Sequence, residues 1–253
     1  MRLLIVMTGR EHPELAAKAI DSVTAQARKP DGVCLVDDAS TDTRMRGLLR
    51  YAALEYGWEV ILNDEREYVL ANQVKAWKQL EPKDEDVIIF VDLDDQLAHE
   101  KALGIVEDAY RDGAWLTYGS YVPEPSSHPG AIGCRPALMY PEYVFSGNLF
   151  RSMVPHFNHL RTISWRVLKH LTDEDLHDDY GESWQANADA SVMIPCLELA
   201  GMHTSFIPDV LYKYTCNSPD AVWRTQRERL ESEWRQLRAR KPRMPLDDRG
   251  KLW

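Results

Sequence analysis

The chain has 253 residues, a net charge of −10, 44% hydrophobic residues and 28% charged residues, which suits one large globular domain with or without a small appendage. The acidic balance argues against a general nucleic-acid binder, and no stretch reaches the ~18 apolar residues of a membrane span. The N-terminal run MRLLIVM (1–7) is too short for a signal peptide, which predicts a cytoplasmic protein. The four cysteines form no CxxC pair, which argues against a zinc knuckle or disulfide framework.

Short apolar runs alternate with helical patterns through the first half of the chain. The apolar runs lie at 3–7, 33–36, 58–62, 87–91 and 114–118. Apolar residues recur at helical spacing over 13–26, 42–56, 71–80 and 98–111. Runs this short, bounded by turn formers, predict buried strands. The alternation therefore predicts an α/β fold with a Rossmann-like, mostly parallel sheet flanked by helices.

The second half of the chain is less regular. A loop rich in proline, serine and glycine covers 121–133, and helical patterns cover 163–171 and 189–200. Basic residues outnumber acidic ones between Val222 and Arg243, where a C-terminal helix is predicted. Its tryptophans and leucines share one face, which predicts packing on the domain or pairing in a homodimer.

Polar residues follow each of the first four predicted strands. They are Thr8-Gly9, Asp37-Asp38, Asn63-Asp64 and the group Asp92, Asp94 and Asp95. The carboxyl ends of parallel strands lie along one edge of a sheet, where ligands bind in open α/β folds. The sequence thus predicts that these four motifs converge on one site.

The triple aspartate after the fourth strand has two interpretations. It resembles the first motif of haloacid-dehalogenase-like phosphatases, which would make Asp92 a nucleophile and Asp94 an acid/base beside magnesium. Gln96, however, stands where that motif has threonine. The motif also follows the fourth strand instead of the first, and Asp37-Asp38 stays unexplained.

The second interpretation extends along most of the chain. Four stretches resemble the GT-A glycosyltransferases of family 2. They are LLIVMTGREHPELAAKAIDSVTAQ (3–26), LVDDASTD (35–42), NDEREYVLANQVKAW (63–77) and VDLDDQLAHEKAL (91–103). The resemblance implies a GT-A fold and an inverting transfer of sugar from a nucleoside-diphosphate sugar, with a UDP-sugar as the expected donor.

The resemblance also implies roles for individual residues. Those expected to contact the nucleotide are Thr8, Asp37, Asp38, Arg66, Asn72 and Asp92. Asp94, together with Asp92 and Asp95, is expected to hold Mn²⁺ or Mg²⁺ on the donor diphosphate, since hard cations take oxygen ligands. The sequence has no histidine after His203, so a further metal ligand near the last strand is not identified.

The acceptor side is expected in the second half of the chain. NADASVMIPCLELAG (187–201) resembles the late helix of the family, whose leading aspartate is the general base, and this places that role on Asp189. HFNHLRTISWRVLKHL (156–171) resembles the segment before that helix, and His159 and Arg161 are expected to contact phosphate or acceptor. The spacing of His156 and His159 could bind a metal, but zinc lacks further ligands nearby.

The resemblance predicts a GT-A domain over 1–221, with a nucleotide-binding half at 1–118 and an acceptor-side half at 119–221. The basic amphipathic helix and tail follow at 222–253. The acceptor is left open between a glycan, a lipid-linked glycan, a protein and a modified nucleic acid. The helix could instead contact a membrane surface or phosphates, which would make the protein peripheral to a membrane. A nonenzymatic nucleotide-sugar-binding paralogue remains the second alternative beside the phosphatase.

Overall fold

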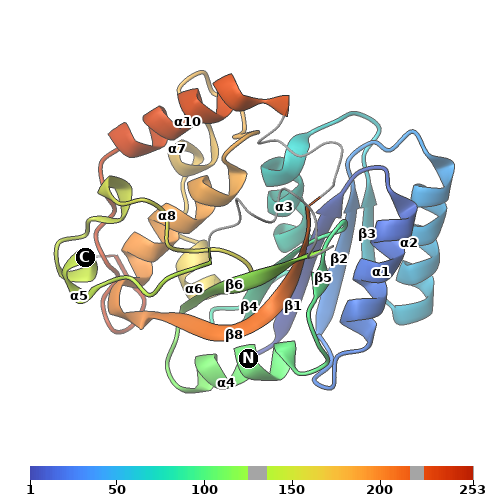
Figure 1. The fold of residues 1–253 in the computed structure, drawn as a ribbon, viewed down its shortest axis with the longest axis horizontal. Coiled ribbons are helices and arrows are strands. Elements are labelled where there is room, and N and C mark those ends of the chain that lie inside the picture. The colour runs from blue at the N-terminus through green and yellow to red at the C-terminus, as the bar shows by residue number, and fades with distance from the viewer. Residues whose placement is uncertain (125–135, 217–224, 253) are drawn as a thin grey trace.

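The computed structural model describes residues 1–124, 136–216 and 225–252 (Figure 1). An eight-stranded sheet runs through it in the order β3-β2-β1-β4-β7-β6-β8-β5. The strands are β1 (Leu3–Gly9), β2 (Gly32–Asp37), β3 (Glu59–Leu62), β4 (Val87–Asp92), β5 (Gln96–Leu97), β6 (Leu116–Glu124), β7 (Arg161–Ser164) and β8 (Thr204–Thr215). The four strands from β3 to β4 are parallel, whereas β7 is antiparallel to both of its neighbours.

Helices flank this sheet as the sequence predicts. They are α1 (Pro13–Thr24), α2 (Thr43–Tyr56), α3 (Tyr68–Gln79), α4 (Ala102–Arg111), α5 (Glu142–Ser146), α6 (Trp165–Leu168), α7 (Asp173–Leu176), α8 (Ala188–Ala200) and α10 (Arg227–Ala239). Short 3₁₀ turns occur at η2 (Phe150–Ser152) and η3 (Gly201–His203). The α/β fold class is therefore confirmed. Among the described helices, none is long and apolar enough to cross a membrane.

The helix predicted over 163–171 is wrong in its first part. Residues Arg161–Ser164 form β7, which pairs with β4 on one side and β6 on the other. The β-branched Thr162 and Ile163 are buried in the sheet, an environment that favours strand. Ser164 then caps α6, because its side chain accepts a hydrogen bond from the Arg166 N–H.

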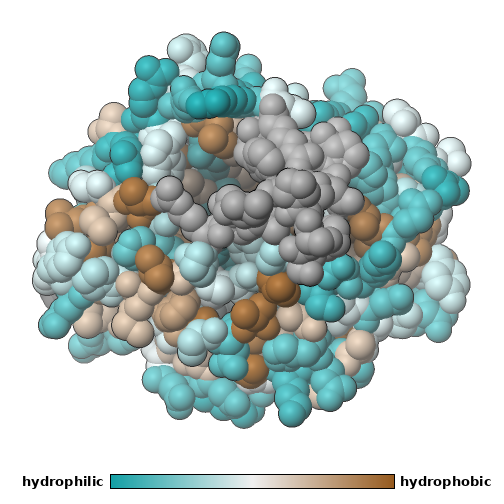
Figure 2. All heavy atoms as spheres, in the orientation of Figure 1, coloured by the Kyte–Doolittle hydropathy of each residue, from teal (hydrophilic) through white to brown (hydrophobic). Residues whose placement is uncertain are grey.

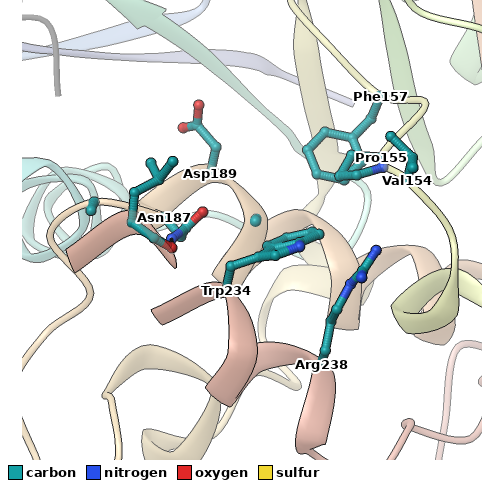
Figure 3. Close-up of a pocket in the computed structure, with 10 residues that line it drawn as sticks. Val154, Pro155, Phe157, Asn187, Asp189, Trp234 and Arg238 are labelled. Carbon is teal, nitrogen blue, oxygen red and sulfur yellow. Dashed lines mark hydrogen bonds between the residues drawn. The ribbon is translucent and has the colours of Figure 1, made fainter. Parts of the chain in front are cut away.

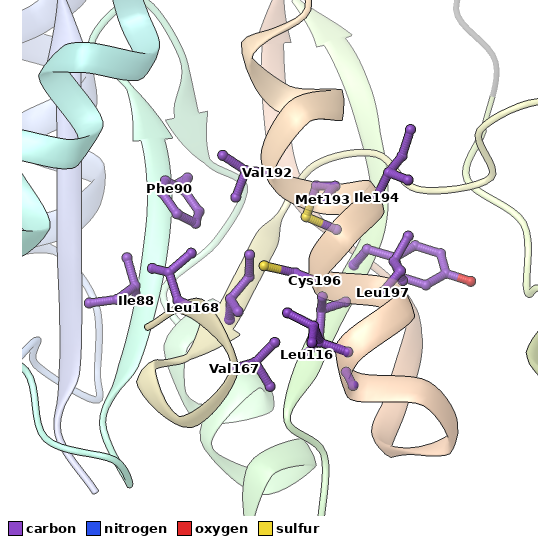
Figure 4. Close-up of a cluster of buried hydrophobic side chains, with 14 of the residues drawn as sticks. Ile88, Phe90, Leu116, Val167, Leu168, Val192, Met193, Ile194, Cys196 and Leu197 are labelled. Atoms are coloured by element: carbon purple, nitrogen blue, oxygen red, sulfur yellow. The ribbon is translucent and has the colours of Figure 1, made fainter. Parts of the chain in front are cut away.

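Both faces of the sheet are buried, and the two hydrophobic clusters alternate along its central strands. Leu3 and Ile5 of β1 face the cluster that α1, α2 and α4 cover, whereas Leu4 and Val6 face the opposite one. This two-residue period is that of an extended strand, and burial on both faces explains why the runs are almost continuously apolar. On the second face, α8 packs over β4, β6 and α6 (Figure 4).

The C-terminal helix α10 packs on this second face beside α8 (Figure 1). Leu237 of α10 and Leu246 beyond it are buried in the same core cluster as α8, and Trp234 is partly buried against it. The outer surface of the view is mostly hydrophilic (Figure 2). The prediction that the helix packs on the domain is therefore confirmed.

Candidate functional site

Strand pairing brings the predicted polar residues to one edge of the sheet. Thr8 pairs with Asp92 across β1 and β4, and Gly9 pairs with Asp37 across β1 and β2. The chain leaves β1 toward β2 and β3 and returns on the other side of β1 with β4. The edge between β1 and β4 is therefore a topological switch point, which is where open α/β sheets bind ligands.

Asp92, Asp95 and His159 form a group that could hold a metal ion at this edge. One ligand atom from each lies within 4.8 Å of the other two. Asp95 and His159 are both buried. Asp95 Oδ2 and His159 Nδ1 have no hydrogen-bond partner among the described residues. Buried polar atoms are normally satisfied, so two unsatisfied ligand atoms beside a second carboxylate fit a cation such as Mn²⁺ or Mg²⁺.

Burial and mutual repulsion make these groups costly to leave without a counter-charge. The pKa of Asp92 is raised to about 6, mainly by burial. The Arg161 guanidinium opposes this rise, and the Asp94 carboxylate adds to it. Burial, with Asp94 and Asp92, raises the pKa of Asp95 well above its usual range. Burial and then Arg161 lower the pKa of His159, which keeps its imidazole neutral and able to ligate. A cation is the counter-charge that this electrostatic arrangement favours.

Asp94 is not a member of this three-residue group. Its backbone carbonyl accepts a hydrogen bond from the Thr215 hydroxyl, while Asp95 Oδ1 accepts one from the Thr215 N–H at 2.7 Å. Strand β8 thus holds Asp95 in the interior, and Asp94 lies half-buried beside it. The metal role of Asp94 stays a prediction.

The position of His159 is set by aromatic residues of β8. Its ring stacks on Tyr212, with ring centroids 4.5 Å apart, and lies beside Tyr214 at 5.7 Å. The Tyr212 hydroxyl accepts a hydrogen bond from the Asp92 N–H at 3.0 Å. One tyrosine therefore contacts both the histidine and the strand end. The sequence pairs His159 with His156 as possible metal ligands and otherwise predicts a phosphate or acceptor contact. It does not predict the approach of His159 to Asp92 and Asp95, because nothing local signals it.

Arg161 connects this acidic group to α8. It begins β7 and is only 3% exposed. Its Nη2 lies 3.9 Å from Asp92 Oδ2, and its Nη1 forms an ion pair with the Asp189 carboxylate. Asp189 lies in the first turn of α8, and 46% of its side chain is exposed. One guanidinium thus lies next to both the candidate base and the candidate metal group.

The nucleotide-binding candidates after β2 have partners within the protein. Asp38 Oδ1 accepts a hydrogen bond from the Glu67 N–H at 2.7 Å, and Asp38 Oδ2 lies 3.5 Å from Arg66 Nε. Asp38 therefore anchors the start of α3. Arg66 is exposed, and its guanidinium lies over the Tyr68 ring, 4.6 Å from the centroid.

Asp37 and Asn72 are both buried and have partners within the protein. Asp37 accepts hydrogen bonds from the N–H and the hydroxyl of Ser40, which closes the turn after β2. Asn72 Oδ1 accepts a hydrogen bond from Asn63 Nδ2 at 2.6 Å. Both side chains hold the loops around the switch point, and their predicted nucleotide contacts stay predictions.

Sequence comparison finds one family. The model for glycosyl transferase family 2 matches residues 4–160, which covers β1 through the segment that carries His159. No curated protein matches the sequence.

Solved structures of similar fold include two nucleotide-sugar complexes. S. aureus TarS 1–349 in complex with UDP-GlcNAc has a TM-score of 0.62 and 15% identity, over 88% of this chain and 61% of that one. The mannosyltransferase PcManGT from Pyrobaculum calidifontis, in complex with GDP-Man and Mn²⁺, has a TM-score of 0.61 and 14% identity, over 95% and 65% of the two chains. The chain spans less than two thirds of either structure, and at such identity the likeness is one of fold.

Proposed function

Because the chain belongs to glycosyl transferase family 2 and has the GT-A fold, we propose that it transfers a sugar from a nucleoside-diphosphate sugar to an acceptor hydroxyl with inversion at the anomeric carbon. Asp189 takes the proton of the acceptor hydroxyl as its oxygen bonds to the anomeric carbon. The bond to the diphosphate oxygen breaks, and its electron pair leaves with the nucleoside diphosphate.

The observation that carries this proposal is the position of Arg161 between Asp92 and Asp189. A guanidinium there can bind phosphate oxygens in a planar, bidentate manner. It also separates the acidic group that would face the donor diphosphate from the carboxylate that would face the acceptor. An inverting reaction needs such a separation, since the attacking and departing oxygens lie on opposite faces of the sugar.

Asp92, Asp95 and His159 would hold the divalent cation. Bound there, Mn²⁺ or Mg²⁺ would neutralise charge on the donor diphosphate. Tyr212 positions this site, because it contacts His159 by stacking and the Asp92 backbone by a hydrogen bond. Asp94 lies close enough in sequence to be a further ligand.

The donor nucleotide is expected to bind along the ends of β1, β2 and β4. Thr8 and Asp38 lie at two of these strand ends, with Arg66 beside Asp38. TarS binds UDP-GlcNAc and PcManGT binds GDP-Man, so both uracil and guanine nucleotides are candidates for this chain. A UDP-sugar remains the donor that the sequence predicts.

Family membership favours the transferase over the phosphatase that Asp92 also suggested. A nonenzymatic paralogue would bind the nucleotide yet transfer nothing. Calorimetry with UDP and GDP in the presence of Mn²⁺, followed by donor turnover in wild type and Asp189→Asn, separates these alternatives. We expect one nucleotide to bind wild type and variant equally, and turnover to fall by ~100-fold or more in the variant.

Substantial turnover in Asp189→Asn would refute the role of Asp189 as base. Binding without turnover in the wild type, across a broad set of acceptors, would favour the paralogue. Phosphate release from a simple phosphomonoester, with no nucleotide binding, would favour the interpretation of the protein as a phosphatase.

A further inference from the structure

A cavity of about 370 Å³ lies beside Asp189, between α8, α10 and the segment 154–157 (Figure 3). Phe157 and Trp234 lie on opposite sides of it, and Arg238 stands at its edge. The space-filling view shows a hollow beneath the hydrophilic α10, with apolar residues at its margin (Figure 2). The volume is within the usual range of small-ligand sites, which are mostly apolar with a few placed polar groups.

The cavity borders the proposed site of proton transfer. Asp189 belongs to its lining, and Figure 3 shows the Asp189 carboxylate directed away from Trp234. The carboxylate meets Arg161 on that far side. A sugar ring held against Trp234 would therefore lie on the opposite side of Asp189 from Arg161. Its hydroxyls would lie at the boundary between this cavity and the site around Arg161.

The polar lining is held in place by α10. Asn187, at the start of α8, donates its side-chain N–H to the Leu230 carbonyl at 2.8 Å. Arg238 lies over the Trp234 ring at 5.0 Å and donates to the Met153 carbonyl at 3.0 Å. The walls of the cavity thus come from three separate parts of the chain, and hydrogen bonds hold these parts together.

We propose that this cavity binds a sugar residue of the acceptor, with Trp234 and Phe157 as its apolar platform. The inference rests on the proposed function and identifies the class of its acceptor. A pyranose presents C–H groups on its faces and hydroxyls at its edge. The C–H face suits the electron-rich face of an aromatic ring, and the hydroxyls suit the side chains of Asn187 and Arg238.

The charges of α10 favour a sugar over a nucleic acid or an anionic membrane. Arg229 forms ion pairs with Glu182 and Glu233, and Arg240 pairs with Asp179. Arg227 pairs with Glu231 one helical turn away. Much of the basic charge of this helix is therefore neutralised within the protein, whereas phosphate binding needs accessible cations.

Donor binding and acceptor binding would then depend on largely different parts of the chain. Trp234 and Arg238 lie beyond residues 4–160, the part that matches the family. Asp189 also lies outside that range, between the two sites. The residues proposed to bind the donor thus lie mostly in the matched part, whereas the acceptor site combines Phe157 from that part with α10 and the start of α8.

The test measures sugar binding directly, without knowledge of the complete acceptor. Saturation-transfer NMR with a panel of methyl pyranosides, at millimolar concentration with diamagnetic Mg²⁺ and UDP or GDP, is applied to four proteins. They are the wild type, Trp234→Ala, Ala186→Phe and Trp58→Ala. Ala186 lines the cavity, so phenylalanine there fills it without removing Trp234. Trp58 is a matched control, because it is a partly buried tryptophan packed against the opposite core cluster.

We expect at least one methyl pyranoside to bind wild type and Trp58→Ala alike, and to bind the two cavity variants at least tenfold more weakly. Calorimetric nucleotide affinity should be the same in all four proteins. Equal sugar binding in the cavity variants, or binding of no pyranoside by wild type, would overturn the proposal. So would a single-stranded RNA oligonucleotide that binds wild type and not Trp234→Ala. If no nucleotide binds at all, the transferase proposal fails, while sugar binding that depends on Trp234 would still establish the site.

Discussion

Glu233 of the C-terminal helix accepts a hydrogen bond from the backbone N–H of Asn187, with 2.7 Å between Oε2 and N. The same carboxylate accepts the N–H groups of Gln185 and Ala186, and its side chain is only 2% exposed. These three donors immediately precede α8, whose first turn carries Asp189. A buried side chain of α10 therefore fixes the chain that leads into the candidate base.

Glu233→Gln should reduce both stability and transfer. Glutamine keeps the volume but loses the charge that binds three N–H groups and Arg229. Hydrogen bonds to charged groups contribute about 1.5–3 kcal/mol each, so we expect unfolding to become easier by roughly that amount. Chemical denaturation measures the stability, and steady-state kinetics should show a lower kcat with an unchanged donor KM.

Glu228→Gln is the matched control, since Glu228 is an exposed carboxylate on the same helix. Glu228→Gln should change neither the unfolding free energy nor kcat measurably. A Glu233→Gln protein with normal kcat at temperatures where it is fully folded would show that Glu233 acts on stability alone.

His159→Ala should weaken Mn²⁺ binding. The histidine is one of three groups whose ligand atoms lie within 4.8 Å of one another, and its removal leaves two carboxylates. We expect a loss of at least tenfold in Mn²⁺ affinity, measured by electron paramagnetic resonance of free Mn²⁺ in the presence of nucleotide.

His156→Ala provides the control for that experiment. His156 also stacks on a tyrosine, with its ring 4.8 Å from that of Tyr140, but it lies outside the three-residue group. Its removal should leave Mn²⁺ affinity unchanged. Equal losses in both variants would show that the effect comes from lost aromatic packing and not from a lost ligand.

Glu198→Gln should destabilise the protein by about 3–5 kcal/mol, because it leaves a buried guanidinium without its counter-ion. Arg151 Nε and Nη2 donate to Glu198 Oε1 and Oε2 at 2.7 and 2.9 Å, and both side chains are buried. The pair ties η2 to α8. Urea denaturation gives the change in unfolding free energy, and the double variant Arg151→Met with Glu198→Gln should recover part of the loss.

An exposed ion pair provides the control for the buried Arg151–Glu198 pair. Glu85 pairs with Arg166, but the Glu85 side chain is 69% exposed. Surface pairs contribute about 0–1 kcal/mol, so Glu85→Gln should have little effect. A comparable loss in both variants would mean that burial does not set the cost of the Arg151–Glu198 pair.

Asp86 should make folding stability depend on pH in the acidic range. Burial alone raises the pKa of this carboxyl, but hydrogen bonds from Arg2 and from the Lys83 backbone outweigh burial and lower the pKa below its usual value. A lowered folded-state pKa stabilises the fold above the unfolded-state pKa of about 3.9, and this stability is lost as pH falls through the folded value.

Asp86→Asn should therefore lower the unfolding free energy at pH 7 by about 1.5–3 kcal/mol and flatten its decline between pH 5 and pH 2. Denaturation across this range measures both effects. Asp84→Asn is the control, because the Asp84 side chain is 57% exposed. If the unfolding free energy of Asp86→Asn fell as steeply with decreasing pH as that of wild type, Asp86 would not be the source of the pH dependence.

The sequence predicts the first half of the fold closely because burial imposes a local period. Apolar runs such as 87–91 become strands buried on both faces, and the spacing over 13–26 becomes α1. The polar residues after these runs reach one edge because parallel strands must all end there. Ile163 and Ser164, at the end of the strand Arg161–Ser164, lie in the range predicted as helix, because the pairing partners of this strand lie far away in sequence.

The sequence by itself determined the fold class, the residues at the strand ends and the position of Asp189 at the start of a late helix. Only the tertiary structure decided that His159 stacks on Tyr212 beside Asp92, and that Arg161 meets Asp189. Only it placed Glu233 and Trp234 of α10 beside α8. The reason is physical: hydrophobic periodicity is local and is present in every element, whereas contacts between distant elements follow from strand order and packing and have no local sequence signal.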